Sequence, residues 1–258
     1  MLLGTLRDDQ ADSSDRLLAA ELAADCVVID DALVDALLSV VRNGEEPEKL
    51  RAQAALSLGP VLELADTDGF ELADDSVPIS EATFLGIQKS LRGLYMDADV
   101  PEEVRRWILE ASVRAPQDWH QAAVRAAYAS DSRDWKLTAV FSMGWVRGFA
   151  EQILEALDSA DRDIHYQAVH AAGHEELDAA WSHIARLLIS TETEKFLRLA
   201  AIDAVTTIRP EEAVIILADL TDSDDEDIVD AALEAMIMAE GLAGSELADD
   251  EDEDTSLH

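Results

Sequence analysis

Six segments of the chain share one pattern of hydrophobic and polar positions. Each template segment has an apolar residue, a polar one, two variable positions, a small residue, an apolar residue, a polar one and a small residue. The segments are LRAQAALSLG from Leu50, VRRWILEASV from Val104, WKLTAVFSMG from Trp135, IHYQAVHAAG from Ile164, LRLAAIDAVT from Leu197 and IVDAALEAMI from Ile228. The apolar and small residues recur at the spacing of one helix face. Each segment therefore predicts a helix with a buried stripe.

The template segments follow one another at a nearly constant interval. Their starts are separated by 54, 31, 29, 33 and 31 residues. A second apolar helix is predicted before each of them, at 32–41, 85–95, 119–129, 149–159, 181–190 and 213–223. A helix pair this small cannot bury its apolar face alone, so neighbouring pairs must stack. The pattern predicts an all-α solenoid of about six helix pairs.

The turn between the two helices of each pair is acidic or polar. The turns read EEPEK, DVPEE, DSRD, SADRD, TETEK and DSDDEDI. Negatively charged side chains are favoured at helix N-termini, where the first backbone N–H groups lack partners within the helix. Pro47 and Pro101 fall near the first turn, where a missing N–H costs little. Each turn therefore predicts the start of a template helix.

The same pattern divides the chain into three parts. Residues 1–31 are predicted as an N-terminal capping helix region and residues 32–241 as the repeat solenoid. The 54-residue interval requires an insertion, and residues 65–82 are predicted as an acidic loop that provides it. This loop is either a bland insertion or a partner-binding loop. Residues 242–258 are almost entirely acidic towards the end and predict a disordered tail.

Charge changes the functional expectations. The formal net charge is −37, which disfavours nucleic-acid backbones and favours basic partners. Only four lysines stand against 32 aspartates, so adaptation to high salt is a second interpretation. The single cysteine, Cys26, cannot form an internal disulfide and is expected in the core. With no signal-peptide pattern and no long apolar run, the chain is predicted to be soluble and cytoplasmic.

The repeat resembles the HEAT-repeat superfamily, in particular the short bacterial type first associated with phycobilisome lyases. The family pattern of an acidic turn followed by V-R-x-x-A-L-x-A-L-G is nearly met at Leu50–Gly59 and Trp135–Gly144. The resemblance covers roughly residues 32–241. It implies a right-handed α-α superhelix and, as usual for such repeats, scaffolding or protein recognition. Because a fold does not determine an activity, the function remains an expectation.

The resemblance and the charge together suggest three functions. The first is a non-enzymatic protein-interaction scaffold or adaptor that uses its concave face. The alternative is a bilin lyase-like or chaperone-like subunit that acts on a chromophore-binding protein, which the resemblance alone implies. A helical-repeat DNA glycosylase is a third, which the acidic charge opposes. The chain is predicted to be a monomer or weak dimer without catalytic residues or cofactors.

Histidines form the one cluster with metal-ligand character. His165, His170 and the pair His174–Glu175 lie close in sequence, and His170 and His174 share a helix face. Helical-repeat iron hydroxylases that act on deoxyhypusine carry several His-Glu pairs, whereas this chain has one. One pair cannot supply the ligands of a di-iron site, so no metal is predicted.

Charge distribution provides the partner-binding candidates. Residues 84–200 hold 13 basic and 18 acidic residues, whereas residues 201–258 hold one and 19. The less acidic middle pairs place several polar and aromatic side chains on their second helices. The predicted partner-binding residues are Lys89, Arg92, Gln121, Arg125, His183, Arg186, Trp119 and Trp181. They predict a basic strip that binds an acidic peptide or the acidic tail of the chain; simple pairing with nearby carboxylates is the alternative.

Overall fold

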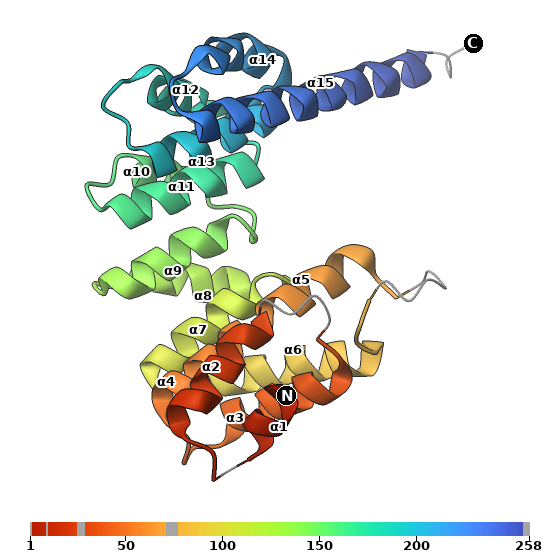
Figure 1. Ribbon diagram of the computed structural model, residues 1–258, viewed down its shortest axis with the longest axis vertical. Coiled ribbons are helices and arrows are strands. Elements are labelled where there is room, and N and C mark those ends of the chain that lie inside the picture. The colour runs from red at the N-terminus through yellow and green to blue at the C-terminus, as the bar shows by residue number, and fades with distance from the viewer. Residues whose placement is uncertain (1, 9, 25–28, 71–76, 255–258) are drawn as a thin grey trace. The chain divides into compact units, whose positions relative to one another are not determined.

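The computed structural model describes residues 2–8, 10–24, 29–70 and 77–254, with the side chains of 243–254 excepted. It divides into two compact units, residues 1–138 and 139–258. Within the described ranges every regular element is helical, and no strand is present. The predicted all-α solenoid is confirmed as the fold class, with helix pairs stacked inside each unit (Figure 1).

The first unit contains eight complete α-helices and the start of a ninth. They are α1 Leu2–Arg7, α2 Ser13–Ala24, α3 Asp31–Arg42, α4 Glu48–Leu56, α5 Gly59–Asp68, α6 Glu81–Met96, α7 Glu102–Ser112, α8 His120–Tyr128 and α9 Arg133–Met143. Helix α9 contains the boundary between the units. Within the first unit, α4 packs beside α7, while α3 covers α4 and α6 covers α7 (Figure 1).

The second unit repeats this arrangement. Its elements are α10 Ala150–Leu157, α11 Arg162–His174, the 3₁₀ turn η1 Asp178–Ala180, α12 Trp181–Ile189, α13 Lys195–Ile208, α14 Pro210–Ala218, the 3₁₀ turn η2 Asp219–Asp222 and α15 Glu226–Asp254. Helices α11, α13 and α15 lie side by side, and α10, α12 and α14 each pack against the template helix that follows (Figure 1).

The first residue of each template segment lies close to the start of a helix in the structure. Helices α4, α7, α9, α11, α13 and α15 each begin two residues before the first residue of their template segment. At α11 the side chain of Asp161 accepts hydrogen bonds from the N–H groups of Asp163 and Ile164, at 3.1 and 3.3 Å. Pro47 and Pro101 occupy the cap positions of α4 and α7. The acidic and proline signals therefore mark helix starts as predicted.

One small-residue contact recurs between consecutive template helices. A Cβ added to Gly59, Gly144 or Gly173, at the end of one template, would meet the alanine Cα at the eighth template position of a later repeat. These alanines are Ala111, Ala171 and Ala204. At Gly144 the distance is an ordinary 3.5 Å, but at Gly173 it is 2.9 Å. The small positions of the template therefore allow the stacked helices to approach closely.

Two segments differ from the sequence-based expectation. Part of the predicted loop at residues 65–82 is helical, because α5 extends to Asp68 and α6 begins at Glu81. Helix α5 was not predicted; Pro60 lies in its first turn, and Val61, Leu62 and Ala65 bury its apolar side. Residues 71–76 of this loop, and Cys26, lie outside the described residues.

The acidic tail is the other difference. Helix α15 continues to Asp254, so the segment 242–254, predicted to be disordered, is helical in the structure (Figure 1). Its alanine, leucine and glutamate residues favour helix, and they extend a helix that is already nucleated. Residues 255–258 lie outside the described residues.

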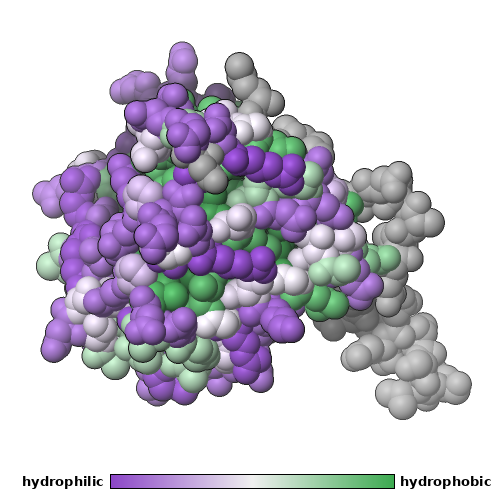
Figure 2. All heavy atoms as spheres, turned by 90° about the horizontal axis from the view of Figure 1, so that it is seen from below, coloured by the Kyte–Doolittle hydropathy of each residue, from purple (hydrophilic) through white to green (hydrophobic). Residues whose placement is uncertain are grey.

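Hydrophilic side chains cover most of the face seen from below, with smaller hydrophobic areas between them (Figure 2). This agrees with the large net charge of −37. Among the described residues, no helix is both long and apolar enough to cross a membrane.

Candidate functional site

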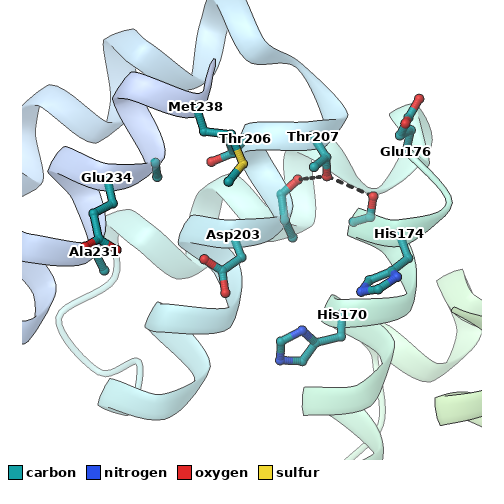
Figure 3. A pocket seen from close by; sticks show the side chains of 12 residues that line it. His170, His174, Glu176, Asp203, Thr206, Thr207, Ala231, Glu234 and Met238 are labelled. Atoms are coloured by element: carbon teal, nitrogen blue, oxygen red, sulfur yellow. Dashed lines mark hydrogen bonds between the residues drawn. The ribbon is translucent and has the colours of Figure 1, made fainter. Parts of the chain in front are cut away.

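A well-formed hollow of the second unit lies across α11, α13 and α15. It is a groove with a cavity volume of about 550 Å³. Twelve residues from the three template helices and the turn after α11 line it: His170, Gly173, His174, Glu176, Asp203, Ala204, Thr206, Thr207, Ala231, Glu234, Ala235 and Met238 (Figure 3). We refer to it as the α11–α15 groove.

The small-residue contact forms one end of this groove. Gly173 of α11 sits against Ala204 of α13, and the hydroxyl of Thr207 donates to the Gly173 carbonyl at 2.8 Å (Figure 3). In the next template segment Thr206 takes the position of Gly173. Its hydroxyl donates back to the Ile202 carbonyl at 2.8 Å, and its side chain contributes to the wall. Close packing thus closes one end of the groove.

The charged side chains that line the groove are carboxylates. Asp203, Glu234 and Glu176 contribute carboxylates, and no lysine or arginine is among the lining residues of this described part of the chain. Partial burial raises the pKa of the Asp203 carboxyl; nearby His170 opposes this shift and Glu234 adds to it. A groove with this lining attracts cations and repels anions.

His170 adds a polar group on the α11 side. Burial lowers the pKa of its imidazole, more than the nearby Asp203 carboxylate raises it, so the ring is neutral at pH 7. The ring lies edge-on to Tyr166, with centroids 4.5 Å apart. Its Nε2 is buried, and no hydrogen-bond partner for it exists among the described residues. The groove is thus lined in part by an imidazole with a buried, unsatisfied nitrogen, whose charge state is influenced by the Asp203 carboxylate (Figure 3).

Exposed apolar side chains of α15, which we call the apolar rim, accompany the groove, and one of them, Met238, lines it. Leu233, Ile237 and Met238 are exposed to 46, 73 and 59% of their surface, and Leu242 to 37%. Leu233 and Ile237 lie on the side of the helix opposite the buried Ala232 and Ala239, whereas Met238 and Leu242 lie on the side of the groove-lining Ala231 and Ala235. Contiguous exposed apolar residues beside charged ones are typical of protein-binding sites.

The structure separates the histidines that were adjacent in sequence. His170 and His174 face the groove, whereas His165 lies nearer the start of α11 and contacts His183. The His174 ring packs on Trp145 at 5.5 Å between centroids. No group of three or more potential metal-binding side chains occurs in the part of the chain that is described.

The predicted basic strip is divided between the two units. Lys89 and Arg92 lie on α6, and Gln121 and Arg125 on α8, all exposed in the first unit. Arg92 pairs with Asp118 at 3.4 Å. These four residues extend from neighbouring second helices of one unit.

Helix α12 carries the remaining strip residues in the second unit. His183 is partly buried, and its Nδ1 lies 3.7 Å from a carboxylate oxygen of Asp158. Arg186 is exposed, and its Nε donates to the Ser182 carbonyl at 3.1 Å. Strip residues in both units thus have local carboxylate or carbonyl partners.

The two candidate tryptophans have different environments. Trp119 is only 6% exposed, stacks between Tyr95 and His120, and donates its indole N–H to Gln117 at 2.8 Å. It is a core residue rather than a partner anchor, because α8 packs this side inward. Trp181 is partly exposed and lies 5.4 Å from the Arg209 guanidinium.

Sequence reasoning missed the residues of the α11–α15 groove apart from its histidines. Asp203 and Glu234 stood in a chain so rich in carboxylates that no single one was informative. One signal for the groove was present in the sequence. The last template helix carries more apolar residues than one buried stripe needs, namely Leu233, Ile237, Met238 and Leu242.

No family model matches the chain, and neither does any curated protein. Solved structures do show similarity. One is human deoxyhypusine hydroxylase in complex with glycerol, with 15% identity over 93% of this chain and 83% of that chain, and a TM-score of 0.43. Another is the CpcE–CpcF complex of phycocyanin lyase from Nostoc sp. PCC7120, with 16% identity over 92% and 93% of the two chains and a TM-score of 0.47.

Proposed function

We propose that this protein is a non-enzymatic interaction scaffold whose α11–α15 groove binds a basic amphipathic segment of another protein. The observation that carries the proposal is the combination of an acidic groove with an exposed apolar rim on α15. A basic amphipathic helix carries both complementary features on adjacent faces.

The rim supports an apolar contact of the right kind. Ile237 and Met238 present flexible and branched side chains to solvent, which is costly unless a partner covers them. Methionine adapts its shape to different partners and is common in grooves that receive helices. The apolar face of the segment therefore packs on α15.

The carboxylates give the contact its polarity. Asp203 and Glu234 line the groove from neighbouring helices, and both are exposed to a lysine or arginine of the partner. With no cation among the lining residues, the partner must supply the neutralising charge. An acidic segment would instead leave like charges facing each other.

A direct test uses synthetic peptides of defined chemistry. We expect a Leu–Lys amphipathic helical peptide to bind the full chain in calorimetry, while a Leu–Glu peptide of equal length and oligolysine bind far more weakly. Asp203→Asn with Glu234→Gln should weaken binding of the Leu–Lys peptide by several-fold to roughly tenfold, since two charge pairs of exposed groups are lost.

Charge removal elsewhere is the matched control. Glu211→Gln with Glu240→Gln deletes the same net charge from exposed sites on α14 and α15 that do not line the groove. This control variant is expected to lose only a little affinity for the Leu–Lys peptide, and the loss should depend on salt. An equal loss of peptide affinity in both double variants would mean that binding depends on net charge alone. The groove would then be rejected as the docking site.

A docking role for the basic residues predicted from the sequence is the second proposal, supported by the exposure of Lys89 and Arg125 in the first unit and of Arg186 in the second. Its partner would be an acidic peptide. In the same titrations, saturable binding of the Leu–Glu peptide that disappears in Arg125→Glu with Arg186→Glu would establish it. Unchanged binding in that variant would refute it. The bilin lyase-like alternative remains a prediction of the resemblance.

A further inference from the structure

A hollow between α9 and α11 borders the α11–α15 groove but has a different lining. Its volume is about 210 Å³, and all of its lining residues belong to the second unit. Five of the eight carry a ring: Phe141 on α9, Trp145 just after it, and Tyr166, His170 and His174 on α11. We refer to it as the α9–α11 hollow.

The repeat explains how the hollow forms. Gly144 and Gly173 hold the same template position, and each lies against an alanine of the next template helix, Ala171 or Ala204. Gly144 and Ala171 both line the hollow, so small residues form its floor, as they do at one end of the groove. Larger side chains at the neighbouring template positions surround the space that these small residues leave.

The chemistry of these surrounding positions changes from helix to helix. The seventh template position is Phe141 in α9, His170 in α11 and Asp203 in α13. Just beyond the template, Trp145 is replaced by His174 in the next repeat. The same architecture is therefore aromatic at α9 and acidic at α13.

The rings of the hollow lie at angles to one another. Phe141 and Trp145 have centroids 6.5 Å apart and planes inclined by 44°, while Tyr166 and His170 have centroids 4.5 Å apart and planes inclined by 70°. The His174 ring lies 5.5 Å from Trp145 and connects the α9 side with the α11 side. All five rings are at least partly exposed, so a ligand can reach them.

Inclined rings around a small space suit a cation. The face of an aromatic ring is electrostatically negative, and several rings together form the aromatic cages that bind quaternary ammonium groups. Neither lysine nor arginine is among the lining residues that the structure describes. Burial lowers the pKa of the His170 imidazole, so this ring is neutral at pH 7 and does not repel a cation.

The lining favours a cation without N–H groups. A lysine ammonium or an arginine guanidinium carries several donors, and each donor that is removed from water needs an acceptor. No carboxylate is among the described residues that line the hollow, and Gln167 provides the one side-chain amide. A quaternary ammonium has no N–H to satisfy, so aromatic faces alone can hold it.

The charge around the hollow favours the same ligand. Through His170 and His174 the hollow is continuous with the α11–α15 groove, whose charged side chains are carboxylates. Arg147, two residues after Trp145, is exposed, and its charge is offset by the nearby carboxylate of Glu175. With a net charge of −37 on the whole chain, the surrounding potential attracts cations.

We propose that the α9–α11 hollow binds a quaternary ammonium group, which the basic segment in the adjacent groove supplies as a trimethylated lysine. Phe141, Trp145 and Tyr166 hold the group by cation–π contacts. The lysine as its source rests on the proposed function, because the hollow and the groove share His170 and His174. The recognition of the quaternary ammonium group itself does not.

The first test titrates the full chain with choline in calorimetry, in excess NaCl so that attraction by the acidic surface is screened. Neohexanol is the control ligand, because it has the shape of choline with a carbon atom in place of the charged nitrogen. We expect saturable binding of choline, and binding of neohexanol that is weaker by roughly tenfold or more.

Variants of the rings locate the site. Trp145→Leu and Tyr166→Leu should each weaken choline binding by roughly tenfold, whereas Trp145→Phe keeps an aromatic face and should lose less. Trp181→Leu is the matched control, because Trp181 is a partly exposed tryptophan of the same unit that does not line the hollow. Circular dichroism checks that each variant is folded.

The second test uses two trimethylated forms of the Leu–Lys peptide. Each carries one trimethylated lysine, near one end or the other, so that both directions of the segment in the groove are covered. We expect one form to bind roughly tenfold more tightly than the unmethylated peptide, and Trp145→Leu to remove this gain.

The outcomes separate this proposal from the proposed function. Absence of saturable choline binding, or equal binding of neohexanol, would overturn the quaternary ammonium site. Choline binding without any gain from methylation of the peptide would leave a free solute as the ligand and reject the lysine. If the unmethylated peptide did not bind at all, the proposed function and the lysine would both be rejected, while the choline titration would still decide the chemistry of the hollow.

Discussion

Replacing Gly173 by valine is expected to lower the free energy of unfolding of the second unit by about 1–3 kcal/mol. A Cβ at this position would lie 2.9 Å from the Cα and 3.0 Å from the Cβ of Ala204. The first of these atoms is backbone, which cannot rotate away. Helices α11 and α13 would therefore have to separate, and the hydrogen bond from Thr207 to the Gly173 carbonyl would weaken.

Gly241→Val is the matched control for this prediction. Gly241 lies in α15 of the same unit, and an added Cβ there meets nothing within 4 Å. The same chemical change should be neutral or stabilise by a few tenths of a kcal/mol, because valine is a better helix former than glycine. Urea denaturation followed by circular dichroism measures both. Similar stabilities for the two variants would show that α11 and α13 do not depend on this close contact.

Acidification is expected to destabilise the first unit through one buried histidine. His120 is fully buried, its Nδ1 accepts from the Gln117 N–H at 2.8 Å, and its Nε2 lies 3.0 Å from the Ser112 hydroxyl. Nε2 must therefore carry the proton and donate to Ser112. Burial lowers the pKa of His120 from 6.5 to about 4.

The direction of the pH effect follows from proton linkage. Below about pH 6.5 the unfolded chain binds a proton at His120 that the folded chain refuses until about pH 4. Unfolding is therefore favoured as pH falls through this window, and stability is retained above it. The difference between the two pKa values corresponds to about 3 kcal/mol once the window has been crossed.

His120→Gln isolates this contribution. The variant loses ring packing on Trp119 and so has a constant offset in stability, but its dependence on pH between 6.5 and 4 should be shallower than that of the wild type. Denaturation at a series of pH values measures both slopes. Titration of the many carboxylates is common to the two proteins and cancels in their difference. Parallel slopes would contradict a neutral buried His120.

Much of the fold was predictable because its signals are local. The six template helices each start two residues before their template segment, and five of the second helices lie where the apolar pattern placed them. The sixth, predicted at 213–223, is helix α14 at Pro210–Ala218 followed by the 3₁₀ turn Asp219–Asp222. Helical periodicity and the chemistry of a first turn involve residues within one or two turns of each other. Helix α5 was not predicted because it interrupts the repeat and lacks the template pattern.

The candidate sites were much less predictable. Asp203 and Glu234 could not be predicted as site residues, because only the packing of α13 and α15 brings them to one groove. Trp119 looked suitable as an exposed anchor, but its position depends on how α8 packs against Tyr95. His165 was grouped with its neighbours in sequence, whereas its spatial partner is His183.

The sequence by itself determined the helical repeat, its period, the starts of its helices and the acidic character of the surface, since these follow from periodicity and composition. Tertiary structure alone decided that Gly173 meets Ala204, that Leu233, Ile237 and Met238 of α15 stay exposed, and that His165 meets His183. The physical reason is the same in each case. Such contacts join helices distant in the chain, and the burial of every other side chain determines how those helices pack.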